Sequence, residues 1–188
     1  MLDLFLELGN LKRLPRAGWL LRGIVSPESI ADHSFRTAII TLFLADELVK
    51  RGVGINVERA VKIALLHDIG EARITDVPLT AQGYLDKGKA ERKAVRELLL
   101  KSPLPGEYFK LWREYEEEST PEGRLVKFAD RLEMLIQAYE YERAGFLNLD
   151  EFWKAVEGLR ESEFYSHFKD IVEELVERRN LVKQQCLR

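Results

Sequence analysis

The chain has 188 residues, of which 46% are hydrophobic and 32% are charged, and its formal net charge is -3. This balance is typical of a folded globular protein and excludes the apolar-poor composition of a disordered chain. The weak negative charge argues against a general nucleic-acid-binding role, which favours a strongly basic surface. No apolar run approaches the roughly 18 residues of a membrane span, and no charged-then-apolar leader is recognisable. We therefore expect a cytoplasmic protein.

The length is sufficient to bury one substantial core, so one domain is expected. The single cysteine, Cys186, cannot form an intramolecular disulfide. This agrees with a reducing compartment.

Hydrophobic residues recur at helical spacing along nearly the whole chain, and no series of β-strands is recognisable, so the fold is predicted to be all-α. Proline, glycine and capping residues mark the ends of the segments. In chain order, the predicted helices cover residues 2–12, 26–51, 56–68, 90–101, 105–118, 120–145, 149–159 and 163–182. Loops are predicted over residues 13–19, which contain Pro15 and Gly18, and over residues 71–89, which contain Gly83 and Gly88.

The most distinctive feature is the dipeptide His67-Asp68, which follows the apolar run of residues 60–66. The inner stripe of its predicted helix continues in steps of three and four residues onto both side chains, so both should lie on the buried face. The stripe consists of Val57, Ala60, Val61 and Ala64. An unpaired charge on that face is costly, whereas a metal ligand has to lie there. Neighbours on a regular helix point about 100° apart, so both can reach one ion only if the helix is distorted near Ile69-Gly70.

Two other helical segments carry the same residue types. His33 is one of only three histidines, and Asp130 is a lone aspartate on the helix that follows Thr120. With His67 and Asp68 they can supply two imidazoles and two carboxylates to one divalent ion. Such ligands suit Co, Mn, Ni, Zn, Mg or Fe(II), and the sequence leaves the choice among these metals open. Each residue alone would more often be a core histidine, a cap or an ion-pair partner, but together they predict a metal site.

The pattern H…HD…D resembles the signature of the HD-domain phosphohydrolases. Further segments in the same order resemble the 5'-deoxynucleotidase branch of that family, and they cover residues 12–19, 28–34, 65–71, 76–78 and 127–134. The resemblance extends over roughly residues 5–145. It implies an all-helical HD-domain bundle, with one domain over residues 1–188 and with C-terminal helices over residues 149–182 packed on its core.

The activity that the resemblance implies is hydrolysis of deoxyribonucleoside 5'-monophosphates to deoxyribonucleoside and phosphate. It also implies a homodimer and one divalent metal ion, with the ligands His33, His67, Asp68 and Asp130. Glu71 and Asp76 match the catalytic carboxylates of the family. Arg16 matches a phosphate-contacting arginine, and Trp19 matches an aromatic beside the sugar that disfavours a 2'-hydroxyl. Bacterial members have these last two residues adjacent, whereas Ala17-Gly18 separates them here.

Each of these four residues also has a structural interpretation. Glu71 fits a solvated helix end, and Asp76 before Val77-Pro78 fits a turn. Arg16 fits a solvated basic cluster, and Trp19 fits a core aromatic. His167 has no companion in the sequence and is interpreted as a packing or surface residue.

Two other functions stay open at this point. One is another HD phosphohydrolase that acts on a cyclic dinucleotide, a nucleoside triphosphate or an alarmone. Dinuclear phosphodiesterases need more histidines than this chain has, and a triphosphate site needs more basic residues than the neighbours of Arg16 offer. The other is a catalytically silent module that senses nucleotides or holds a structural metal, but such a module has no need of Glu71 and Asp76.

Overall fold

The computed structural model describes residues 1–84 and 86–186, without the side chains of Leu79, Gln82 and Cys186. Within these residues the predicted all-α fold is confirmed, and the only extended pairing is an isolated bridge between Pro15 and Ser29. The helices are α1 (Leu2–Leu8), η1 (Gly9–Lys12), α2 (Ala17–Leu20), α3 (Ile30–Lys50), α4 (Val57–Leu66), α5 (Glu71–Ile74), α6 (Leu79–Gln82), α7 (Lys87–Leu99), α8 (Pro105–Glu116), α9 (Pro121–Arg143), η2 (Phe152–Lys154), α10 (Ala155–Arg160) and α11 (Tyr165–Cys186). None of the helices described combines the length and the apolar character needed to cross a membrane.

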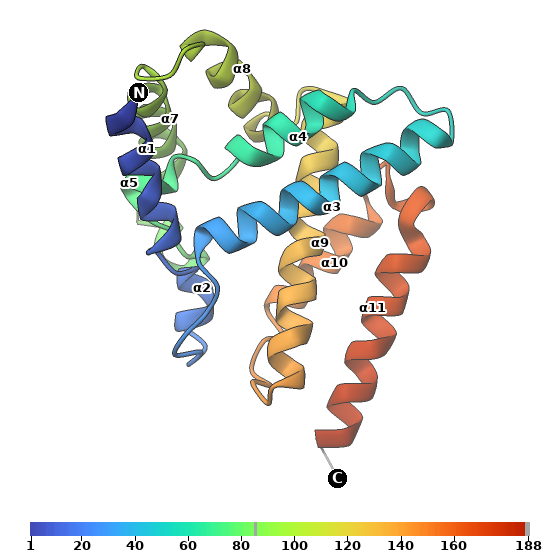
Figure 1. Ribbon diagram of the computed structural model, residues 1–188. Coiled ribbons are helices and arrows are strands. Elements are labelled where there is room, and N and C mark those ends of the chain that lie inside the picture. Colours follow the sequence, from blue (N-terminus) through green and yellow to red (C-terminus); the bar gives the residue numbers. More distant parts are fainter. Residues whose placement is uncertain (85, 187–188) are drawn as a thin grey trace.

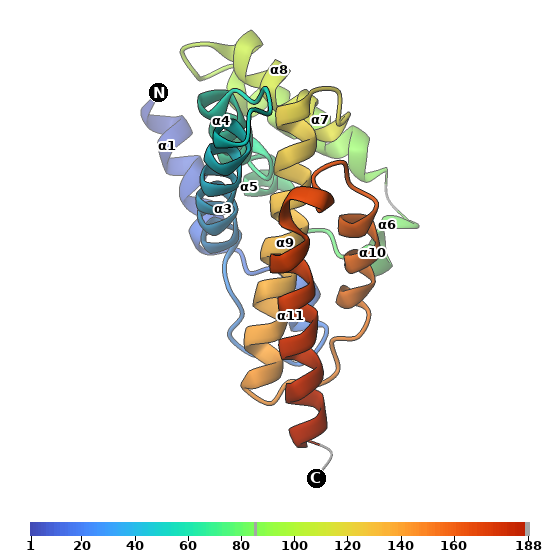
Figure 2. The ribbon, with the colours of Figure 1, turned by 90° about the vertical axis from the view of Figure 1, so that its right-hand side faces the viewer.

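Helices α3, α4 and α9 form the centre of the molecule and pack against one another (Figure 1). Helix α9 is also covered by α8 on one side and by α10 and α11 on another, and Figure 2 shows α11 lying along it. Because neighbours surround α9, buried residues occur around most of its circumference, as expected for a central helix. Leu125, Phe128, Leu132 and Leu135 are among its buried residues and recur at helical spacing.

Side-chain caps fix where three long helices begin. Asn56 accepts a hydrogen bond from the backbone N–H of Arg59 at 2.9 Å, and Thr120 accepts one from Gly123 at 3.1 Å, so both predicted N-caps are confirmed. The prediction that a helix opens at residue 26 is wrong. Ser29 and Asp32 form a reciprocal capping box, which starts α3 at Ile30 and leaves residues 26–28 extended.

The two predicted loops contain short helices. Residues 13–19 include most of α2, and residues 71–89 include α5, α6 and the start of α7, while residue 85 lies outside the described residues. Helices of four residues are too short to show a helical repeat, so no periodicity could reveal them. Helix α7 starts before Gly88 because the side chain of Asp86 accepts a hydrogen bond from the backbone N–H of Lys89 at 3.0 Å.

Candidate metal centre

The turn after α4 aims His67 and Asp68 at the same point. Helix α4 ends at Leu66, and the backbone N–H of Ile69 bonds to the Leu66 carbonyl at 3.1 Å, which tightens the chain into a turn. The chain therefore leaves the regular helix at His67 and Asp68. This is the kind of distortion that the sequence analysis required if both side chains are to reach one ion. Gly70 lies so close to α7 that a Cβ there would be 2.8 Å from Cγ2 of Val95, so the turn requires glycine.

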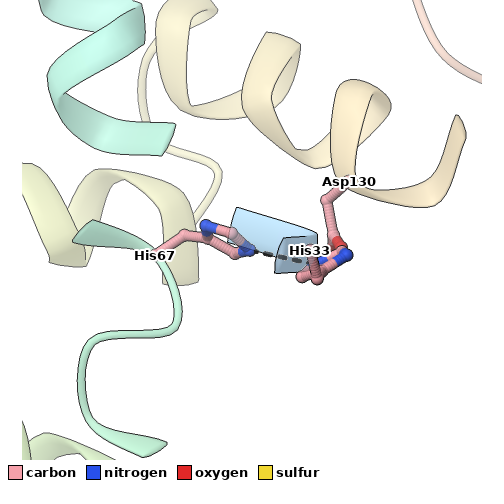
Figure 3. Close-up of side chains that lie close together, drawn as sticks. All are labelled: His33, His67 and Asp130. Atoms are coloured by element: carbon pink, nitrogen blue, oxygen red, sulfur yellow. Dashed lines mark hydrogen bonds and ion pairs between the residues drawn. The ribbon is translucent and has the colours of Figure 1, made fainter. Parts of the chain in front are cut away.

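The structure brings together the four side chains that the sequence analysis selected. In Figure 3, His33 projects from α3, His67 from the turn after α4 and Asp130 from α9. Asp68 follows His67 in the same turn. The Nε2 atom of His33 lies 3.3 Å from Nε2 of His67 and 3.1 Å from Oδ1 of Asp130. The Oδ2 atom of Asp68 is 3.3 Å from Nε2 of His67 and 3.6 Å from Nε2 of His33.

These distances fit a shared cation. Metal–ligand bonds of about 2.1 Å hold neighbouring donor atoms about 3 Å apart. Nδ1 of His67 lies 2.7 Å from the Ala64 carbonyl, which can only accept, so Nδ1 carries the proton and Nε2 offers a lone pair. Nδ1 of His33 contacts the carboxylate of Glu133 in the same way. Both buried imidazoles thus present Nε2 to the centre, as metal-binding histidines do.

The charges around His33 also favour a cation. Burial opposes the charged ring, yet the hydrogen bonds to Asp130 and Glu133 raise the pKa of His33 to about 10. Burial likewise opposes ionisation of Asp68, but its interactions with His67 and with the Arg16 guanidinium hold its pKa well below the ordinary value. The donor set of two imidazoles and two ionised carboxylates therefore fits a divalent metal ion.

Glu71 lies beside this centre. It is the first residue of α5 and is only 1% exposed, so the interpretation as a solvated helix end is wrong. Its Oε2 atom is buried and has no hydrogen-bond partner among the described residues. Burial, followed by the negative charge of Asp68, raises the pKa of Glu71 to about 9. An acid in this state can exchange a proton with a neighbouring group near neutral pH.

Asp76 and Arg16 reach the centre from two other segments. The Oδ2 atom of Asp76 accepts a hydrogen bond from the backbone N–H of Ala17 at 2.7 Å, so Asp76 fixes the start of α2. It follows Thr75, whose φ of 64° is strained for a β-branched residue. Arg16 donates from Nη1 to Oδ2 of Asp68 at 3.0 Å and is largely buried, so it is not part of a solvated basic cluster.

Trp19 is a core residue at the edge of the site. It is 2% exposed, and its Nε1 donates to Oε1 of Glu28 at 3.0 Å. Its ring stacks on Phe152 with the centroids 4.2 Å apart and meets the edge of Tyr141. Trp19 is therefore a core aromatic residue, as its structural interpretation predicted. One side of its ring also lines the cavity described next.

A cavity of about 560 Å³ is lined by two of the four side chains, Asp68 and Asp130. Arg16, Glu71 and Asp76 line it, together with several residues that the sequence analysis did not select. These are Lys87, Tyr115, Lys127, Met134, Phe152 and Lys154. Three lysines thus line the cavity together with Arg16, and they come from segments other than the sequence neighbours of Arg16 that were weighed against a triphosphate site.

Part of this cavity lining could have been predicted from the spacing of residues along a helix. Lys127 precedes Asp130 by three residues on α9 and therefore shares its face. Tyr115, over whose ring the Lys127 ammonium lies, donates to Oδ2 of Asp130 at 2.7 Å. Phe152 comes from η2, beyond the segments that carry the family resemblance, and no sequence signal points to it.

Comparisons with known proteins agree with this geometry. Residues 8–178 match the family model described as HD domain. The zebrafish (Danio rerio) protein named 5'-deoxynucleotidase HDDC2 is 39% identical over 165 residues, which cover 84% of this chain and 78% of the relative. A solved structure from Pyrococcus furiosus, titled a conserved hypothetical protein, is 54% identical with a TM-score of 0.87 and covers 94% of this chain and 99% of its own. Another, titled a predicted metal-dependent phosphohydrolase from Magnetospirillum magnetotacticum, is 26% identical with a TM-score of 0.70 and covers 94% of each chain.

Proposed function

Because the chain belongs to the HD domain family, we propose that it is a metal-dependent 5'-deoxynucleotidase. Such an enzyme is a phosphoric monoester hydrolase, which converts a deoxyribonucleoside 5'-monophosphate and water to a deoxyribonucleoside and phosphate. The observation that carries the proposal is the convergence of His33, His67, Asp68 and Asp130, of which the two aspartates line a cavity. The name of the zebrafish relative and the 39% identity to it support the choice of substrate.

The four converging side chains would hold the metal ion. An ion bound there would polarise a phosphoryl oxygen and make a bound water more acidic. Its identity is among Co, Mn, Ni, Zn, Mg and Fe, since imidazole and carboxylate ligands admit all of them.

Three further side chains supply the remaining chemistry in this proposal. In its ionised form, which a divalent ion bound beside it would favour, Glu71 would take a proton from the attacking water at its unpartnered Oε2. Asp76 is anchored through Oδ2, and in its protonated form its Oδ1 would give a proton to the leaving 5'-oxygen. The proton that the attacking water loses balances this one over the reaction cycle. Arg16 donates one N–H to Asp68 and would direct its other N–H groups toward the phosphate oxygens. A guanidinium can form bidentate hydrogen bonds with phosphate.

The cavity volume agrees with a substrate of this size. Small-molecule sites usually have volumes of roughly 300–1,000 Å³, and the cavity here has about 560 Å³. The phosphate would lie at the acidic and metal-binding wall, and the nucleoside would extend toward Trp19, Met134 and Phe152. The lysines of the cavity, Lys87, Lys127 and Lys154, would offset the negative charge of the substrate.

The test of the proposed function is phosphate release from deoxyadenosine monophosphate in the presence of a panel of divalent ions. We expect hydrolysis with at least one added transition metal and none in excess chelator. Adenosine monophosphate measures the preference for the 2'-deoxy sugar. The proposal is overturned if no deoxyribonucleoside monophosphate is hydrolysed with any ion, or if a cyclic dinucleotide or a triphosphate is hydrolysed with a higher kcat/KM.

The aromatic face of Phe152 is expected to contact the nucleoside. Replacing Phe152 by alanine should raise KM for deoxyadenosine monophosphate about tenfold with little change in kcat, since stacking of a base contributes about 1–3 kcal/mol. Steady-state phosphate release measures both constants. Phe152→Tyr keeps the ring and serves as the matched control. An unchanged KM in Phe152→Ala would show that the nucleoside lies elsewhere.

We also propose that residues 1–188 form one domain, that the protein is cytoplasmic and that it is a homodimer, as the family resemblance implies. An apolar stripe on α3 supports the dimer, since Phe35 and Phe43 are 66% and 65% exposed and Ile39 lies between them. Exposed apolar patches of this kind often mark protein–protein contacts. Light scattering should give twice the chain mass of 21.8 kDa, and a monomer at micromolar concentration would contradict the dimer.

A further inference from the structure

Glu133 is a fully buried carboxylate beside the metal centre that the proposed chemistry does not use. It lies one turn after Asp130 on α9 and faces α3. Its Oε2 atom contacts Nδ1 of His33, and its Oε1 atom accepts a hydrogen bond from Nε of Arg36 at 2.7 Å. Charged side chains are almost never fully buried unless they are paired, so the burial of Glu133 needs a physical explanation.

Arg36 holds Glu133 in place from the opposite side. Its Nη2 donates to Oε1 of Gln137 at 2.5 Å, and its Nη1 donates to Oε2 of Glu140 at 2.8 Å. The guanidinium is thus fixed against α9 by three acceptors, spaced about one helical turn apart.

We propose that Glu133 is a positioning residue for His33. Its carboxylate accepts the Nδ1 proton, which fixes the tautomer, orients the ring and makes Nε2 a more basic ligand. Arg36 keeps this carboxylate aligned, although it touches neither the ion nor the substrate. The inference rests on the metal site of the proposed function, but its test measures ion binding, so it can fail while the hydrolase activity stands.

The same side chains could instead hold a second ion. Donor atoms of Glu28, His33 and Glu133 lie within 4.8 Å of one another. Three observations favour the positioning role. Nδ1 of His33 cannot bind an ion while it donates to Glu133, Arg36 already occupies the other oxygen of Glu133, and Oε1 of Glu28 accepts from the indole of Trp19.

The test is calorimetric titration of the metal-free protein with Mn²⁺ or Co²⁺. Wild type should bind one ion, and Glu133→Gln should bind one ion about 10–100-fold more weakly, as is usual when a hydrogen-bond partner of a metal-binding histidine is changed. Glu140→Gln is the matched control, because it removes a carboxylate from the same arginine without touching His33. Its dissociation constant should stay within twofold of wild type.

A second readout separates positioning from general stability. Long-range ¹H–¹⁵N NMR of the histidine rings should show His33 protonated at Nδ1 in the ion-loaded wild type. In Glu133→Gln, the same proton should be less protected from exchange with solvent. Glu133→Asp, which keeps the charge but shortens the side chain, should bind the ion with intermediate affinity. Unchanged affinity in Glu133→Gln overturns the proposal. Two ions in wild type and one in Glu133→Gln would also overturn it, because Glu133 would then be a ligand.

Discussion

Replacing His67 by alanine should lower kcat/KM for deoxyadenosine monophosphate at least about 10³-fold, to the limit of detection. The variant loses one of two imidazoles at the proposed metal site, and a bound ion supplies several kcal/mol of transition-state stabilisation, with about 1.4 kcal/mol for each factor of ten. Asp68→Ala should have the same effect. Phosphate release with saturating metal and the metal content of the purified variants are the two measurements.

The third histidine provides a matched control for this experiment. His167 lies in α11, and its backbone carbonyl accepts a hydrogen bond from Arg51, away from the four converging side chains. His167→Ala should retain activity and metal content. His67 is buried, so circular dichroism should establish that His67→Ala is folded. Activity that survives in both His67→Ala and Asp68→Ala would rule out metal-dependent chemistry at this site.

The second large effect is expected for Glu71→Gln. The amide keeps the size of the side chain but can neither take nor give the proton, and general acid–base catalysis is worth about 10²–10⁴-fold. We therefore expect kcat to fall by about that factor. KM and the affinity for the metal ion should change little, because Glu71 is not among the four side chains that converge on the centre.

Two results would contradict this role of Glu71. An unchanged kcat would show that Glu71 is only a buried structural acid. Lost ion binding would show that it is a ligand. Glu97→Gln is the control, because it removes an exposed carboxylate that pairs with Arg73 outside the cavity. It should leave kcat, KM and the affinity for the metal ion unchanged.

Long helices and their caps were predictable because each depends on residues close in sequence. The caps at Asn56 and Thr120 and the buried stripe of α9 follow from local hydrogen bonds and from the helical repeat. The start of α3 was predicted too early, since proline and glutamate at residues 27–28 also suit a first turn. The choice of Ser29 depends on its reciprocal bonds with Asp32.

The four side chains of the proposed metal site were predictable because the sequence places rare polar residues on apolar helical faces. The roles of neighbouring residues were not predictable in this way. Glu133 and Arg36 look like ordinary surface charges of two helices until α3 and α9 pack together. Phe152 approaches the site only through the packing of η2 against Trp19 and α9.

An anomalous difference map from crystals grown with Mn²⁺ tests the central claim most directly. We predict one peak per chain within bonding distance of Nε2 of His33, Nε2 of His67 and carboxylate oxygens of Asp68 and Asp130. Loss of the peak in His67→Ala crystals would complete the assignment. A fully loaded protein whose manganese lies elsewhere, or in which Asp130 does not contact the ion, would contradict the account.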